Sequence, residues 1–174
     1  MSLAINILLY LIGYTGLVLF QVLVLNRLDL SFYINPYVYP FFVLMLPFRM
    51  QHSLLMLAAF FAGLLMDAFA NTASLHAASL VFLAFVRPYW INAITPKGGY
   101  ETDDRPNIRN LGFGWFVLYS FVLILLHHFF YFFLEVFSLS SVFSTIGKTI
   151  LSTVVSTILI VLLAYLFSRE RKRA

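Results

Sequence analysis

The stretch "FFAGLLMDAFANTASLH", residues 60–76, carries a carboxylate near the end of an otherwise apolar run. When this run is written as an α-helix, Ala59, Gly63, Asp67 and Asn71 follow one another at i+4 spacing. Small and polar side chains therefore share one face, and bulky aliphatic and aromatic side chains cover the rest. Small residues let another helix approach closely, so we expect this face to pack on protein and the bulky face to contact lipid.

Asp67 is expected toward the outer end of a membrane-spanning helix that starts near Ser53. The rise between the two residues is about 21 Å, at 1.5 Å per residue. A short turn follows, so the next helix returns antiparallel and brings His76 within reach of Asp67. One interpretation is an interhelical hydrogen bond that fixes the hairpin, and the other is a partner-binding or ligand-binding role. Arg87 is about a full span further along, so we do not expect it to pair with Asp67.

Composition indicates an integral membrane protein. Of the 174 residues, 62% are hydrophobic and 10% are charged, with a mean hydropathy of +0.94, whereas an average soluble domain is roughly 45–50% apolar. The chain has no cysteine, which excludes disulfides and thiolate metal sites. The N-terminal apolar run has no preceding basic residue and no evident cleavage site, so we interpret it as a retained span and not as a signal peptide.

Apolar runs separated by polar breaks predict an all-α polytopic membrane protein with about six transmembrane helices. Five spans are expected at residues 3–25, 53–70, 73–94, 113–137 and 142–167. A sixth run, "LSFYINPYVYPFFVLMLPF" at residues 30–48, contains Asn35, Pro36 and Pro40. Proline lacks a backbone N–H and kinks helices, so this run could span, bend or re-enter, and five spans are the alternative.

The distribution of basic residues predicts a cytoplasmic C-terminus. When the spans are counted back from such a C-terminus, Lys148 faces outward. Nine basic residues face the cytoplasm: Arg49, Arg87, Lys97, Arg105, Arg109, Arg169, Arg171, Lys172 and Arg173. We expect one integral membrane domain at residues 1–168 and a basic cytoplasmic tail at residues 169–174. The loop at residues 95–110 has three basic and three acidic residues and is most simply a solvated connector. The predicted location is therefore a membrane, with the C-terminus on its cytoplasmic side.

A second polar face lies in "LLHHFFYFFLE", where His127, Tyr131 and Glu135 follow at i, i+4 and i+8. This spacing differs from the His-Glu-x-x-His signature of metalloproteases, and no third strong ligand is obvious, so packed or solvated polar groups are the simpler interpretation. The chain also lacks a G-x-S-x-G turn and paired intramembrane aspartates. Its basic residues are too dispersed for a nucleic-acid surface. We therefore expect no enzymatic activity, no cofactor and no metal.

An ordered set of short motifs resembles the MreD family, the small membrane subunit of the bacterial rod-shape machinery. The set consists of Asn35-Pro36, "LPF" at residues 46–48, "GLLMD" at residues 63–67, Asn71-Thr72, "HAA" at residues 76–78 and Arg87-Pro88. It covers about a third of the chain. Two positions depart from the family pattern: many members have an acidic residue where this chain has Tyr37, and a glycine where it has His76.

The resemblance implies a non-enzymatic scaffold in the bacterial inner membrane that coordinates lateral peptidoglycan synthesis and cell shape. It implies MreC as a partner, with MreB and the RodA polymerase with its transpeptidase as further associates. The family is similar in fold to the S components of energy-coupling-factor transporters, so an alternative function is the binding of a small vitamin-like ligand for uptake. We expect the helix-packing or partner interface at Ala59, Gly63, Asp67, Asn71 and His76.

Overall fold

A computed structural model describes residues 3–28, 33–100, 105–137 and 142–168. The elements of this part of the chain are all helical: α1 (Leu3–Leu23), the 3-10 helix η1 (Leu25–Arg27), α2 (Phe41–Leu44), α3 (His52–Ala70), α4 (Leu75–Ala93), α5 (Ile108–Leu111), α6 (Phe113–Val136) and α7 (Val142–Phe167). The predicted all-α class is confirmed. The five expected helices are present, and their ends lie within two residues of the predicted positions.

Three helices in the described ranges, α3, α6 and α7, are long and apolar enough to cross a membrane. α4 has 19 residues but includes Arg87 and Pro88, and it is not among these three. The apolar stretch described in the region of α1, Leu11–Arg27, is shorter. The structure thus supports a helical membrane protein, whereas the number of membrane spans stays a prediction.

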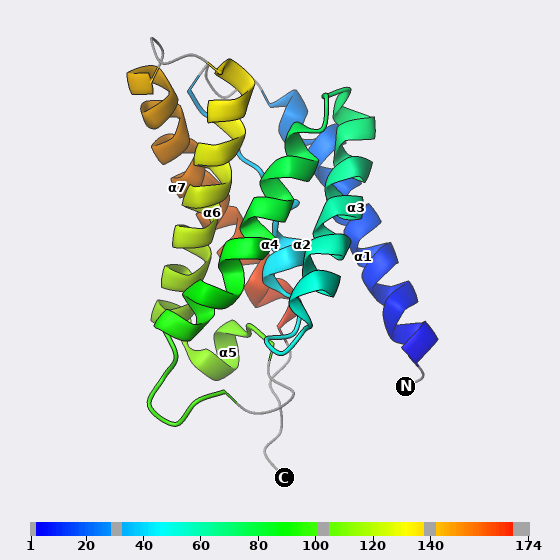
Figure 1. Cartoon of the computed structure of the whole chain (residues 1–174), viewed down its shortest axis with the longest axis vertical. Coiled ribbons are helices and arrows are strands. Elements are labelled where there is room, and N and C mark those ends of the chain that lie inside the picture. Colours follow the sequence, from blue (N-terminus) through cyan, green and yellow to red (C-terminus); the bar gives the residue numbers. More distant parts are fainter. Residues whose placement is uncertain (1–2, 29–32, 101–104, 138–141, 169–174) are drawn as a thin grey trace.

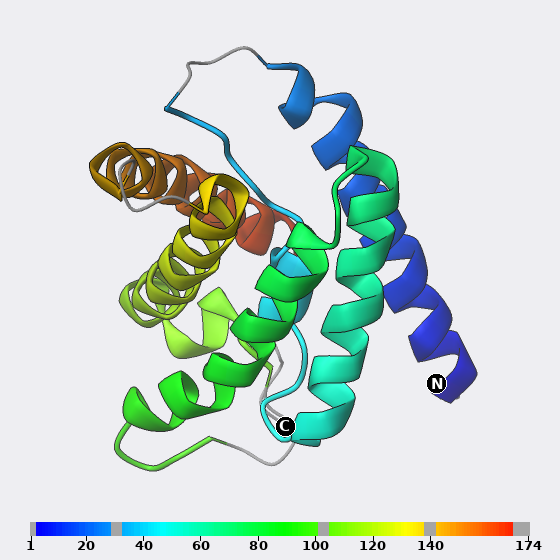
Figure 2. The same ribbon diagram turned by 45° about the horizontal axis from the view of Figure 1, so that its top comes forward.

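The proline-containing run at residues 33–50 is not a transmembrane helix. It is mostly extended and turn-like, with only the single turn of α2 in its middle. Pro36 removes a backbone donor and disfavours helical conformation in the residue before it, and Pro40 is the N-cap of α2. The run passes from one end of the molecule to the other, between α1 and α7 (Figures 1 and 2). We call residues 33–50 the central segment.

The long helices surround the central segment. α3 and α4 form a tight hairpin, α4 packs on α6, and α6 packs on α7. α1 lies beside α3 at the edge of the molecule (Figure 2), where the Tyr14 hydroxyl donates to the carbonyl of Ala62 at 2.6 Å. In the central segment Val38, Tyr39, Val43 and Leu44 are completely buried. Non-helical backbone at membrane depth is tolerated where protein encloses it, and this arrangement meets that condition.

Candidate functional site

Asp67 caps the N-terminus of the neighbouring helix. Its Oδ1 accepts the backbone N–H of His76 at 3.0 Å and its Oδ2 accepts that of Ala77 at 2.9 Å. The Thr72 hydroxyl also donates to Oδ1, at 2.5 Å. The first N–H groups of a helix have no partner within it, and its dipole favours a negative group there. The carboxylate in the apolar run therefore joins α3 to the start of α4.

Asp67 and His76 meet as expected, although through a different group. The contact uses the backbone N–H of His76, whereas its imidazole points to another partner. The sequence pattern placed the two residues together but did not show that residue 76 is the second residue of α4. A carboxylate at the end of one helix and a short turn before the next is the signal for such a cap.

Gly63 is the closest point of the α3–α4 hairpin. A Cβ atom added there would overlap the Cα of Ala77 and lie 2.7 Å from its backbone nitrogen. Ala59, one turn earlier, is completely buried, and Asp67 is 5% exposed. Much of the small-and-polar face is thus buried inside the fold. Asn71 leaves this face: it is exposed and ends α3 in the left-handed conformation, with φ of 54°.

Arg87 was expected among the basic residues of the cytoplasmic side, but its side chain is completely buried. Its Nε donates to the Tyr119 hydroxyl at 2.8 Å, and its terminal nitrogens donate to the carbonyls of Leu44, Leu46 and Pro47. The Tyr119 hydroxyl donates in turn to the Leu44 carbonyl at 2.8 Å. Arg87 therefore satisfies carbonyls of the central segment that no helix would satisfy.

Arg49, the other predicted basic residue at a span end, is exposed and precedes α3. It can contribute to a cytoplasmic positive surface, whereas Arg87 cannot.

Side chains of α1 and α7 complete the hydrogen bonds of the central segment. Gln21 accepts the N–H of Val38 at 2.8 Å and donates to the carbonyl of Pro36 at 3.0 Å. Ser156 accepts the N–H of Tyr37 at 2.8 Å. Ser152, one turn before it on α7, accepts the N–H of Asn35 at 2.9 Å. Buried polar side chains from α1, α4, α6 and α7 thus replace the hydrogen bonds that a helix would make internally.

A chain of hydrogen bonds connects two buried histidines through a tyrosine of the central segment. The Tyr39 hydroxyl lies 2.8 Å from Nδ1 of His76 and 2.8 Å from Nε2 of His127. His127 is completely buried, and its Nδ1 has no hydrogen-bond partner in the described residues. Sequence reasoning missed Tyr39 because its side chain lies between helices only once the central segment has folded into the interior.

The predicted polar face of α6 does not form one site. His127 and Tyr131 are buried, whereas Glu135 makes an ion pair with Lys148 of α7 at 2.8 Å. No group of three histidine, cysteine or acidic side chains suited to a metal ion occurs in the ranges that the structure describes. The three residues lie on one helix, as predicted, but two of their side chains are in the interior and that of Glu135 is at the rim.

A polar cavity of about 200 Å³ lies beside the Asp67 cap. It is bounded by the end of α3, the start of α4, α6, the end of the α1–η1 region and the central segment. Its lining residues are Leu25, Asn26, Leu28, Asn35, Pro36, Tyr37, Ala70, Thr72, His76 and Tyr131. We call this space the polar cavity. His76 is therefore shared between the Tyr39 chain and the polar cavity.

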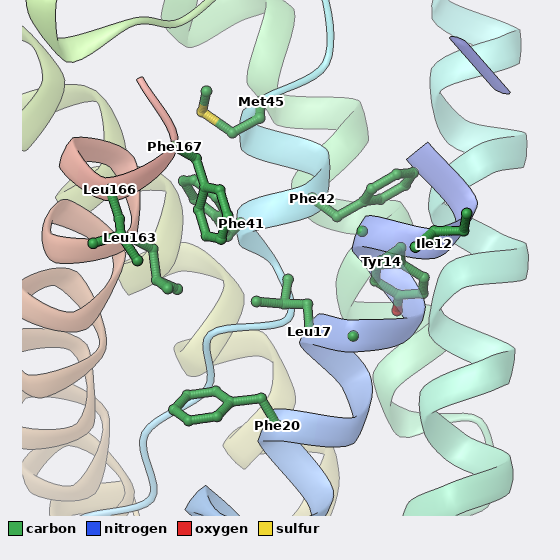
Figure 3. Close-up of a pocket in the computed structure, with 12 residues that line it drawn as sticks. Ile12, Tyr14, Leu17, Phe20, Phe41, Phe42, Met45, Leu163, Leu166 and Phe167 are labelled. Carbon is green, nitrogen blue, oxygen red and sulfur yellow. The ribbon is translucent and has the colours of Figure 1, made fainter. Parts of the chain in front are cut away.

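An apolar groove separates α1 from α7 (Figure 3). Its volume is about 500 Å³, and the central segment forms its floor through Phe41, Phe42 and Met45. Leu163, Leu166 and Phe167 of α7 line one side, and α1 lines the other. Gly13 and Gly16 of α1 belong to the lining, and a Cβ added at either meets no atom within 4 Å. We call this surface the α1–α7 groove.

In the described residues the fold is all-helical, with three helices long and apolar enough to cross a membrane, and buried polar side chains bind a largely non-helical segment in its interior. Comparison of the chain with protein-family models, with curated proteins and with solved structures gives no match.

Proposed function

We propose that the chain is a non-enzymatic scaffold subunit of the bacterial cell-elongation machinery that binds MreC in the inner membrane. In this function it coordinates lateral peptidoglycan synthesis and cell shape, and MreB and the RodA polymerase with its transpeptidase are further partners. The motifs that resemble the MreD family support the proposal. No bond is made or broken: close helix packing holds the partner in one orientation.

The residues behind the resemblance have connected structural roles. Gly63 and Asp67 form the hairpin with α4, and Arg87 binds carbonyls of the central segment, including those of Leu46 and Pro47. A shared motif of this kind belongs to a shared fold and not to a partner surface. We therefore propose that the partner binds elsewhere than on the small-and-polar face of α3.

The α1–α7 groove is the observation that carries the proposal. The groove is lined almost entirely by apolar side chains. The contacts of α1 with other helices are chiefly those with η1 and α3. Open glycines at positions 13 and 16 offer a helix the close approach that membrane helix pairs use. An apolar transmembrane helix of MreC is the partner that we assign to this groove.

Charge supports the proposed orientation. Three exposed basic residues belong to the end of the molecule where the chain begins (Figure 1). Arg49 precedes α3, Lys97 follows α4 and Arg109 belongs to α5. Arg27 and Lys148 belong to the opposite end. A cytoplasmic location of the more basic end agrees with the positive-inside rule. The predicted tail at residues 169–174 lies outside the described residues.

Gly16→Leu tests the proposal, and Gly147→Leu is its matched control. Both glycines lie in helices where an added Cβ meets no neighbour, but only Gly16 lines the groove. We expect Gly16→Leu to reduce co-purification of MreC several-fold at unchanged thermal stability, and Gly147→Leu to leave it unchanged. Normal recovery of MreC with Gly16→Leu contradicts the assignment of the groove.

The alternative of vitamin uptake has weaker structural support. Pockets for drug-sized ligands typically measure about 300–1,000 Å³, whereas the polar cavity measures about 200 Å³. Of the three residues that such a ligand pocket would use, Asp67, Asn71 and His76, only His76 lines the polar cavity. The Asp67 oxygens are engaged by the hairpin.

A further inference from the structure

We propose that the polar cavity binds one small uncharged molecule that carries several hydroxyl groups, of the size of a single sugar ring. This inference is independent of MreC binding, because the cavity and the α1–α7 groove share no lining residue. The argument rests on the free nitrogen of His76, on the lining groups and on the absence of charge among them.

The hydrogen-bond chain determines what His76 offers to the cavity. Tyr39 has one hydroxyl proton, so it donates to one imidazole and accepts from the other. Nδ1 of His127 is buried without a partner, and a buried N–H without an acceptor is rarer than an unpaired acceptor. We therefore place the proton of His127 on Nε2, which donates to Tyr39.

Tyr39 then donates its own proton to Nδ1 of His76, which leaves the His76 proton on Nε2. The structure shows no hydrogen bond from Nε2 to a residue in the described ranges, and Nε2 is not among the buried polar atoms that lack a partner. His76 is 2% exposed and lines the polar cavity. Its Nε2–H is thus a fixed donor that faces the cavity and can bind a hydroxyl or carbonyl oxygen.

The remaining lining groups suit a polyhydroxyl ring. Asn26 and Asn35 line the cavity from η1 and the central segment. A side-chain amide can both donate and accept, and the Asn26 oxygen already accepts one hydrogen bond, from Gln21. The rings of Tyr37 and Tyr131 meet edge to face, with centroids 5.0 Å apart, and form an aromatic wall beside His76. Such a mixture of ring faces and hydrogen-bonding groups fits a sugar ring, which has apolar C–H faces and a polar edge.

The absence of charged residues from the cavity lining disfavours ionic ligands. None of the residues that line the cavity is charged. The nearest carboxylate, Asp67, already accepts three hydrogen bonds from Thr72, His76 and Ala77. An ion that entered the cavity would lose its hydration without a counter-charge, which is costly in a buried site. An uncharged molecule avoids this cost.

The absence of cysteine in the chain makes a protection experiment direct. Ala70 lines the cavity and is half-buried, whereas Ala73, three residues later, is exposed and lies outside the lining. Full-length Ala70→Cys and Ala73→Cys proteins in detergent are labelled with N-ethylmaleimide, and the labelling rate is measured. Glucose, glucuronate and glucosamine serve as probes, because they share one ring and differ in charge.

We expect glucose to slow labelling of Ala70→Cys several-fold in a saturable manner and to leave Ala73→Cys unchanged. Glucuronate and glucosamine should have little effect. Adding His76→Phe to Ala70→Cys keeps an aromatic ring but removes the donor, and it should abolish protection by glucose while the labelling rate without sugar stays measurable. Retained MreC binding by this double variant would show that the cavity and the proposed scaffold function are separate.

The proposal is overturned if saturating glucose fails to protect Ala70→Cys, since the cavity then holds only water. Equal protection by all three sugars, or stronger protection by a charged one, also overturns the assignment to an uncharged ligand. Complete resistance of Ala70→Cys to labelling would show that the cavity is closed to small molecules, with the same consequence.

Discussion

Two charged residues, Asp67 and Arg87, are buried because each satisfies backbone groups that the surrounding chain leaves unpaired. Asp67 accepts N–H groups at the start of α4, and Arg87 donates to carbonyls of the central segment. The sequence identified Asp67 as unusual for a membrane span and predicted Arg87 at the cytoplasmic end of its helix. It did not indicate their partners, because a backbone group has no signature in the side-chain pattern.

Removal of the Asp67 cap should destabilise the protein. We expect Asp67→Ala to lower the free energy of unfolding by about 2 kcal/mol, because two N–H groups of α4 lose their acceptor. Asp67→Asn keeps one acceptor oxygen and should lose less. Unfolding in mixed detergent, followed by circular dichroism, measures the difference. Equal stability of Asp67→Ala and the unmodified protein would contradict the capping role.

Replacement of Arg87 should destabilise the protein more than replacement of Arg49. Arg87→Met removes a donor from the carbonyls of Leu44, Leu46 and Pro47. Leu44 keeps the Tyr119 hydroxyl and Pro47 keeps the N–H of Met50, whereas Leu46 loses its donor, and we expect a loss of about 3 kcal/mol. Arg49→Met is the control, since Arg49 is exposed. Amide hydrogen exchange is the measurement, and exchange in residues 41–48 should increase in Arg87→Met alone. Unchanged exchange there would show that the guanidinium does not hold the segment.

At the scale of elements, apolar length and polar breaks predicted the five long helices, because these properties are local. The central segment was the uncertain element, and its path could not be predicted. Its hydrogen-bond partners come from four helices that precede and follow it in the sequence: Gln21, Arg87, Tyr119, Ser152 and Ser156. Only prolines 36 and 40 signalled that a helix would fail there.

The α3–α4 hairpin provides a prediction at this scale. Gly63→Ala should already strain the hairpin, because the added Cβ overlaps backbone atoms of Ala77 that cannot rotate away. Gly147→Ala adds the same group in open space and should not destabilise the protein. The melting temperature and the yield of monodisperse protein report the difference. A Gly63→Ala protein as stable as Gly147→Ala would mean that the helices are further apart than described.

At the scale of the whole molecule, one end of the fold is more basic than the other, and the orientation that this predicts in the membrane can be tested. Lys97→Cys lies in the connection after α4, whereas Ala73→Cys lies in the α3–α4 turn at the other end (Figure 1). In cells with a permeable outer membrane, a membrane-impermeant thiol reagent should label Ala73→Cys, and Lys97→Cys should react only after cell lysis. The reverse pattern would invert the proposed orientation.

The sites were less predictable than the fold, because they depend on which faces meet. The i+4 pattern correctly predicted that Ala59, Gly63 and Asp67 face protein. The contacts of this face are with α4 of the same chain. The polar cavity combines residues from the central segment and from four parts of the helical bundle. The α1–α7 groove is defined by helices that do not pack closely, and no sequence pattern marks a missing contact.

The central segment also constrains the order of events during biogenesis. A helix can enter a bilayer alone because its backbone hydrogen bonds are internal, whereas residues 33–50 depend on side chains of α4, α6 and α7, which the ribosome makes later. We expect this segment to wait at the membrane surface until those helices have inserted, and to enter the bundle last. Nascent chains that end before α7 should accordingly leave it accessible to protease.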